Sequence, residues 1–247
     1  MTKSRFDWAK LNRFSILSSV LKCKKQLVNK KLSIKEIHTI FAAHLKSYFP
    51  IKIKKKISKD TELGCVYIGG MYYSGHDIES KPCIEIILQY SFFDEYLTIG
   101  NALFKRISIA ITDALLHEAL HMKQFRSRKF KVIPNYIGTA EKLKQRLEQT
   151  YLGDTDEIDS YGFNIACELN DKFKGDEVAI IDFLNKLTHR NVQRPSTWIA
   201  YLKAFDHNHN HVIIKKVKKR ILYYIPYAKV GSPFKSSDRL KQLHHIY

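Results

Sequence analysis

One segment, residues 101 to about 126, constrains the fold of this chain more than any other. It contains neither glycine nor proline, and its apolar residues recur at the three- and four-residue spacing of one helix face. That face is formed by Leu103, Ile107, Ile111, Leu115 and Met122. Because most of the segment is apolar, the pattern predicts a helix that is buried in the core.

The same helix carries three polar residues, His117, Glu118 and His121, within the sequence HEALH. Residues four apart lie on one helix face, so both imidazoles can direct a ring nitrogen at a single metal ion, at about 2.0–2.1 Å. Glu118 can then reach a metal-bound water without being a ligand, as a general base must. The alternative is a set of polar residues that satisfy one another through hydrogen bonds, without a metal.

Three segments before this helix have the two-residue period of β-strands, at 51–57, 65–73 and 83–90. We expect them to form a small antiparallel sheet, with the segment SGHDIESKP as a hairpin-type connection. The strand CIEIILQY could be the sheet edge along which an extended peptide lies, although a strand in a small sheet needs no such purpose.

Helices are predicted on both sides of this region. The first covers residues 8–30, and the second begins at Ser33, which forms a capping box with Glu36, and ends before Pro50. An irregular basic stretch after residue 126 leads to further helices near 139–151, 154–173, 176–188, 195–205 and 212–222. The expected fold class is α+β, with a small antiparallel sheet packed on a buried helix and further helices C-terminal to it.

The net charge of +18 is unevenly distributed along the chain. Residues 1–60 carry 16 basic and 3 acidic side chains, residues 203–247 carry 10 and 2, and residues 61–202 carry 16 and 19. We therefore expect a basic helical N-terminal region, 1–60, a core, 61–202, and a basic C-terminal extension, 203–247, packed as one unit. The basic ends favour a polyanion such as nucleic acid as a partner, but the same charge could serve solubility alone.

Cysteine spacing and hydropathy bound the setting in which the protein works. The four cysteines form no C-x-x-C pair, which argues against a zinc ribbon or a redox dithiol and favours a reducing compartment. No apolar run approaches the roughly 20 residues that a transmembrane helix needs. We therefore expect a cytoplasmic protein without a membrane span.

The HEALH segment resembles the H-E-x-x-H zinc metallopeptidases, the zincins, over the motif itself and, in layout, over residues 65–170. The resemblance implies that His117 and His121 bind Zn²⁺ and that Glu118 is the catalytic base. It also implies an active-site helix beside a small sheet. Lys123 departs from the extended zincin pattern, which usually has an apolar residue there.

The resemblance also bears on the third metal ligand. Metzincins place a third histidine six residues after the second, where this chain has Ser127, and SprT-like proteases place one somewhat further on, but no histidine occurs between 121 and 189. Gluzincins instead take a glutamate from a following helix, and the segment DEIDSYGFNIACEL is similar to their pattern. On that pattern Glu157 is the third ligand, and Tyr161 replaces the usual aspartate.

Glu157 also has a structural interpretation, because Asp154-x-x-Glu157 matches a capping box. The lesser candidates for the third ligand are Asp154, Asp156, Asp159 and Glu168. Asp113, four residues before His117, could accept the second N–H of a ligating histidine, or it could be a simple polar break in the helix.

Candidates for a transition-state hydrogen-bond donor are Tyr161, Tyr201, His189 and Arg190, none with support from spacing. The segment DHNHNH, at 206–211, could bind a transition metal weakly but is more typical of a polar loop between helices.

The sequence thus predicts a zinc-dependent metallopeptidase of gluzincin type, with Zn²⁺ as cofactor and a protein or peptide as substrate. Its size and lysine-rich composition are also similar to those of phage-encoded peptidases. The alternative is a nucleic-acid-binding or structural protein that uses the basic ends, in which the motif is inert or holds a structural metal.

Overall fold

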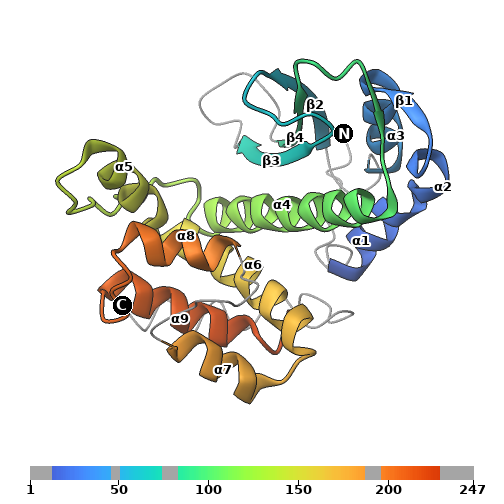
Figure 1. Cartoon of the computed structure of the whole chain (residues 1–247). Coiled ribbons are helices and arrows are strands. Elements are labelled where there is room, and N and C mark those ends of the chain that lie inside the picture. The colour runs from blue at the N-terminus through green and yellow to red at the C-terminus, as the bar shows by residue number, and fades with distance from the viewer. Residues whose placement is uncertain (1–12, 46–50, 74–82, 187–195, 229–247) are drawn as a thin grey trace. The chain divides into compact units, whose positions relative to one another are not determined.

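The computed structural model describes residues 13–45, 51–73, 83–186 and 196–228 (Figure 1). The chain forms two compact units, one of Met1–Met122 with Val230–Tyr247 and one of Lys123–Lys229. The first holds the sheets and most of the long helix, and the second is helical, which gives an α+β fold. The proposed division at residues 60 and 202 stays a prediction.

The first unit begins with short helices that pack on one another. They are α1 (Arg13–Lys22), α2 (Lys24–Leu27) and α3 (Ile34–Leu45), so one helix over 8–30 is wrong in detail: it is interrupted at Cys23, and residues 8–12 lie outside the described residues. The predicted capping box is confirmed, because the Ser33 amide donates to Glu36 Oε2 at 2.8 Å and the Glu36 amide donates to Ser33 Oγ at 3.3 Å.

The main sheet is mixed, not antiparallel as predicted. Its strands are β2 (Ile51–Ser58), β3 (Val66–Tyr73) and β4 (Cys83–Ser91), in the order β2-β4-β3. β3 is antiparallel to β4, whereas β2 is parallel to it. The period-two pattern placed all three strands but carries no information about their relative direction.

The strand CIEIILQY, suggested as an edge, is the central strand of this sheet. Five of its residues, Cys83, Ile84, Ile86, Leu88 and Tyr90, are buried apolar residues, as expected for a strand that is covered on both faces. The lysine-rich β2 occupies an edge, where exposed charge opposes pairing with another chain. A second, two-stranded sheet pairs β1 (Lys31–Ser33) with β5 (Tyr96–Thr98). The sequence did not predict these two strands, because three residues are too few to show a two-residue period.

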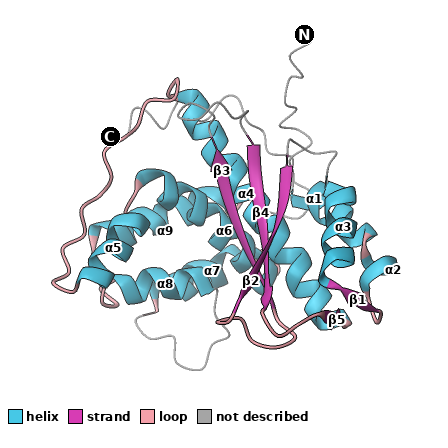
Figure 2. Cartoon of the chain, turned by 90° about the horizontal axis from the view of Figure 1, so that it is seen from above, coloured by secondary structure: helices cyan, strands magenta, loops and turns pink. Residues whose placement is uncertain are grey.

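The predicted long helix is confirmed as α4 (Asn101–Ser127), which packs on the main sheet (Figures 1 and 2). Its buried face includes Phe104, Ile107, Ile111, Leu115 and Met122, close to the face predicted from spacing. The helix continues without a break past Met122, so its last residues, from Lys123, belong to the second unit.

The second unit contains five helices within the described residues: α5 (Leu143–Leu152), α6 (Thr155–Phe173), α7 (Glu177–Asn185), α8 (Ser196–Ala204) and α9 (Val212–Tyr224). α6 and α9 pack side by side (Figure 1). α5 begins four residues later than predicted, because the side chain of Gln149 accepts hydrogen bonds from the amides of Thr139 and Ala140 and holds them in a loop.

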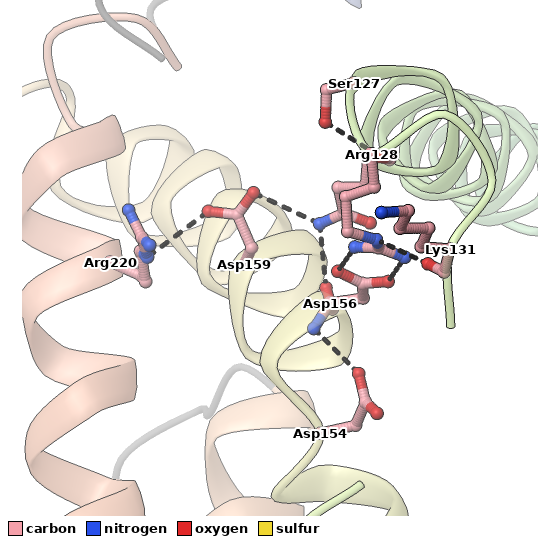
Figure 3. A network of polar contacts seen from close by, with 8 residues as sticks. Ser127, Arg128, Lys131, Asp154, Asp156, Asp159 and Arg220 are labelled. Carbon is pink, nitrogen blue, oxygen red and sulfur yellow. Dashed lines mark hydrogen bonds and ion pairs between the residues drawn. The ribbon is translucent and has the colours of Figure 1, made fainter. Parts of the chain in front are cut away.

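A buried carboxylate ties three helices of this unit together (Figure 3). Asp159, on α6, accepts a hydrogen bond from the Tyr224 hydroxyl at 3.0 Å and from Gln124 Nε2 at 3.2 Å, and it pairs with Arg220 Nε at 3.4 Å. Burial, with the Asp159 carboxylate beside it, raises the pKa of Tyr224 well above its usual range, so the hydroxyl stays a donor. Asp159 therefore joins α6 to α9 and to the last turns of α4.

Replacing Asp159 by alanine should lower the free energy of unfolding by about 3 kcal/mol, because the substitution leaves the Arg220 charge buried without this carboxylate. Urea denaturation checks the value. Asp182→Ala, at an exposed position on α7, is the matched control and should change it by less than about 0.5 kcal/mol. An Asp159→Ala protein as stable as the control would contradict this role.

Candidate metal centre

Two buried imidazoles meet on one face of α4. His117 is 6% exposed and His121 is 9% exposed, and their Nε2 atoms lie 3.0 Å apart. One helical turn separates the two residues, which brings the rings edge to face at 4.7 Å between centroids. The spacing that suggested a metal pair from sequence thus brings one nitrogen of each ring to the same point.

The separation of these nitrogens suits a shared metal ion. Two nitrogen ligands 2.0–2.1 Å from a tetrahedral zinc ion lie about 3.3 Å apart, close to the observed 3.0 Å. In the absence of a metal, one Nε2–H can donate to the other Nε2, so the same geometry serves both states. A small outward movement of either ring is enough to admit an ion.

A carboxylate completes the group. His117, His121 and Glu157 each offer one ligand atom, and these three atoms all lie within 4.8 Å of one another. Among the histidine, cysteine and acidic side chains of the described ranges, these three have ligand atoms close enough together to hold one metal ion. Glu157 as a residue is half-buried, whereas its carboxylate atom Oε2 is buried.

Glu157 lies in the first turn of α6, where Asp154 is the N-cap. The Asp154 carboxylate accepts a hydrogen bond from the Asp156 amide at 2.7 Å. A capping box would have Glu157 accept the Asp154 amide, but that amide donates to the carbonyl of Tyr151 at 3.1 Å. Asp154 therefore caps α6 without the Glu157 carboxylate. This removes the capping box, which was the main alternative to metal binding as a role for Glu157.

The start of α6 is held against the end of α4 within the second unit. Arg128, just after α4, binds both carboxylate oxygens of Asp156, at 2.5 and 2.6 Å (Figure 3). Gln124 donates to the Asp156 carbonyl at 3.2 Å. A bidentate arginine pair fixes orientation as well as distance. Glu157, the next residue, is thereby placed relative to the last residues of α4, which belong to the same unit.

These contacts also account for the other acidic candidates. Asp154 caps α6, Asp156 binds Arg128 and Asp159 binds Tyr224 and Arg220. Each carboxylate therefore has a structural task, and none of them belongs to the group with the two histidines. Glu168 lies near the other end of α6 and is not part of that group either.

Three tyrosines of the second unit lie close together near the start of α6. The Tyr151 hydroxyl lies 3.0 Å from the Tyr161 hydroxyl. The Tyr161 ring meets the rings of Tyr151 and Tyr201 edge to face, at 6.2 and 6.1 Å. Partial burial raises the pKa of Tyr151 far above its usual range, and the Tyr161 and Glu157 groups raise it further. Burial likewise raises the pKa of Tyr201, with the Glu157 charge adding to the effect.

Sequence reasoning named Tyr161 and Tyr201 but missed Tyr151. The turn at Gly153, between α5 and α6, brings the end of α5 back beside the first turn of α6. No spacing rule connects residues across such a turn, so no sequence signal pointed to Tyr151. The predicted donor role of Tyr161 stays a prediction.

Glu118 lies against the sheet. It is 7% exposed, and a Cβ added to Gly70 of β3 would lie 2.9 Å from Glu118 Cγ and Oε1. The absence of a side chain at position 70 is therefore what leaves room for the glutamate between α4 and the strand. The adjacent glycines in β3 were the available signal, since glycine in a strand often marks a close approach of another group.

The remaining candidates lie elsewhere or outside the described residues. Asp113 pairs with Arg13 at 3.2 Å within the first unit, and its predicted contact with a ligating histidine stays a prediction. His211 caps α9 through Nδ1 and stacks on Phe205, so the DHNHNH segment is a loop between α8 and α9 whose histidines form no metal group within the described ranges. His189 and Arg190 lie outside the described residues.

Comparison of the chain with protein-family models, with curated proteins and with solved structures finds no match. Across the part of the chain that the structure describes, no helix combines the length and the apolar character needed to cross a bilayer. What the structure supports is therefore an α+β protein with a His-His-Glu group that could bind a metal ion.

Gly70→Ala should lower the free energy of unfolding by about 1–3 kcal/mol, because the new methyl group overlaps the Glu118 side chain. Gly69→Ala is the matched control. The nearest atom to a Cβ there is Ile87 Cβ at 3.9 Å, an ordinary contact, so this variant should be neutral or slightly stabilised. Urea denaturation of the two variants makes the comparison.

A double-mutant cycle identifies the clashing group. In a Glu118→Ala background the cost of Gly70→Ala should vanish, because the Glu118 atoms closest to the added methyl lie beyond Cβ and are removed. An equal cost in both backgrounds would show that Glu118 is not what requires a glycine at position 70.

Proposed function

We propose that the protein is a zinc-dependent metallopeptidase of gluzincin type. The observation that carries the proposal is the convergence of His117, His121 and Glu157, with ligand atoms within 4.8 Å of one another. Two imidazoles and a carboxylate are a common protein ligand set of catalytic zinc, which leaves a position for water. The H-E-x-x-H resemblance assigns the metal as Zn²⁺ and the reaction as peptide hydrolysis.

The residues of the site have separable tasks. His117 and His121 hold the metal through Nε2, and Glu157 holds it through one carboxylate oxygen. When bound, the metal polarises a carbonyl and lowers the pKa of a coordinated water to about 7. Glu118 takes the proton of the water that attacks the peptide carbonyl and delivers it to the leaving amine. Its position between α4 and β3 keeps the carboxylate away from bulk solvent.

β3 supports a peptide as the substrate. Within the described strands it pairs on one side only, with β4, so its other edge can hydrogen-bond to an extended chain. Gly70 lies on this strand directly against Glu118. A peptide that extends the sheet along β3 would therefore run past the general base. The proposed substrate strand is therefore β3 and not CIEIILQY, which is central in the sheet.

The nucleic-acid partner suggested by the basic ends stays a prediction. Exposed lysines on β2 and α9 are compatible with it, but no described contact distinguishes binding from solubility. The two functions can be separated experimentally, because polyanion binding should not depend on the Glu118 carboxylate. It should weaken steeply with added salt instead.

Glu118→Gln should reduce hydrolysis of an unfolded protein such as casein by a factor of about 10²–10⁴, the usual contribution of a general base. The variant keeps the size of the side chain and should retain zinc and stability. Glu148→Gln, at an exposed position on α5, is the control and should hydrolyse casein like the wild type.

Zinc-loaded wild-type protein without activity on casein or on peptide libraries, or a Glu118→Gln variant as active as the wild type, would contradict the proposed peptidase. A salt-sensitive affinity of the wild type for DNA, equal in Glu118→Gln, would support the alternative partner.

A further inference from the structure

The main sheet has a face that is turned away from α4. Side chains alternate between the two faces of a strand, and the approach of Gly70 to Glu118 identifies the face that packs on α4. The opposite face, which we call the outer face, carries Glu85 and Ile87 of β4 and the residues in register with them. Figure 1 shows the sheet above α4, and Figure 2 looks onto it from above.

Two rows of different chemistry run along the outer face. The edge strand β2 contributes three exposed lysines, Lys52, Lys54 and Lys56. The other edge strand, β3, contributes Tyr67 and Met71, which are 46% and 45% exposed. Because β4 lies between them, the two rows are about 10 Å apart. A chain that lies along the face can therefore meet cations on one side and a ring on the other.

The outer face keeps a net positive charge. Its acidic residue on β4 is Glu85, which is 4% exposed and pairs with Lys54 at 2.8 Å between Nζ and Oε1. That pair balances the charge of Lys54, but Lys52 and Lys56 lie on either side of it along β2. Neither β2 nor β3 contains an acidic residue.

The centre of the outer face is open. Gly69 lies there, in register with Ile87, and is exposed. A Cβ added to Gly69 would meet Ile87 Cβ at 3.9 Å, an ordinary contact, so packing within the protein does not require a glycine. A glycine inside a strand weakens the strand and often marks a place where a ligand approaches the backbone closely.

Tyr67 has a second exposed ring near it, at the same end of the sheet. Phe92 directly follows β4 and is 57% exposed, and its amide donates to the Ser58 carbonyl at 2.9 Å. The Lys59 ammonium lies over the Phe92 ring, 5.6 Å from its centroid. Exposed rings beside cations are what single-stranded nucleic-acid sites combine, because the cations follow the phosphates and the rings stack on bases.

The ring and the open centre distinguish this face from a simple basic surface. Lysines on an edge strand oppose pairing with another chain, and lysines alone attract any polyanion. Neither role needs Tyr67 or Gly69. A duplex keeps its bases stacked on one another, whereas a single strand can offer the face of a base to a protein ring.

We propose that the outer face of the main sheet binds single-stranded nucleic acid, with phosphates along the β2 lysines and a base stacked on Tyr67. The face lies within the first unit, and it is distinct from the β3 edge at which the peptide substrate is proposed. The inference does not rest on the metal site.

The charge test uses the full chain and a labelled oligothymidylate of about 20 nucleotides, with fluorescence anisotropy at several salt concentrations. The double variant Lys52→Gln/Lys56→Gln removes two charges from the outer face. Lys215→Gln/Lys219→Gln, at exposed positions on α9 in the other unit, is the matched control. The slope of log affinity against log salt should fall by about 1.4 in the first and stay unchanged in the second.

The stacking test uses Tyr67→Ile, which removes the ring and keeps a residue that favours strands. Tyr96→Ile is the control, because Tyr96 is 49% exposed and lies on β5, in the other sheet. Tyr67→Ile should bind oligothymidylate about 5–100-fold more weakly and should bind heparin, a polyanion without bases, like the wild type. Thermal unfolding checks that each variant is folded.

The wild type should also prefer oligothymidylate to a duplex of the same length. Equal affinity for the two, or no affinity for oligothymidylate, would overturn the inference. A Tyr67→Ile protein that binds oligothymidylate like the wild type would do the same, as would a salt dependence carried by the α9 lysines. Binding to phosphatidylserine vesicles in place of oligothymidylate would assign the face to a membrane and overturn it as well.

Discussion

The structure depends on how polar side chains are accommodated on the buried face of α4. Two imidazoles and a carboxylate lie among the mostly apolar buried residues of this helix, and each is less than 10% exposed. Burying such groups without partners costs on the order of several kcal/mol, more for a charged group. A metal shared by the two histidines would offset this cost for both rings at once, and the space beside Gly70 accommodates Glu118.

Within the second unit, two sets of contacts hold α6 in place. Arg128 and Gln124 fix the first turn of α6 against the end of α4 through Asp156. Asp159, one turn further, anchors α6 to α9. Both sets of contacts hold a helix in place, so their loss should lower the stability of the protein.

Sequence periodicity predicted most of the elements and the local part of the site. The face of α4, the capping box at Ser33 and the spacing of His117 and His121 all depend on residues within one or two turns, whose geometry is fixed by the helix itself. The assignment of Glu157 required the resemblance, because Asp154-x-x-Glu157 is equally typical of a cap. Only the observed partner of the Asp154 amide separates the two interpretations.

What the sequence did not predict depends on contacts between distant segments. The parallel pairing of β2 with β4 is set by the path of the chain and not by alternation. The approach of Gly70 to Glu118 joins residues 48 positions apart, and the contact between the Tyr151 and Tyr161 hydroxyls crosses a turn between two helices. Neither approach has a period that a pattern could reveal.

The most direct test of the account is the zinc content of the purified chain, measured by elemental analysis after reconstitution with zinc, beside His117→Ala and Glu157→Gln. The account predicts nearly one zinc ion per chain in the wild type and a clear loss in both variants. Wild-type protein that holds no zinc would contradict the metal centre. Zinc retained fully in Glu157→Gln would contradict the third ligand.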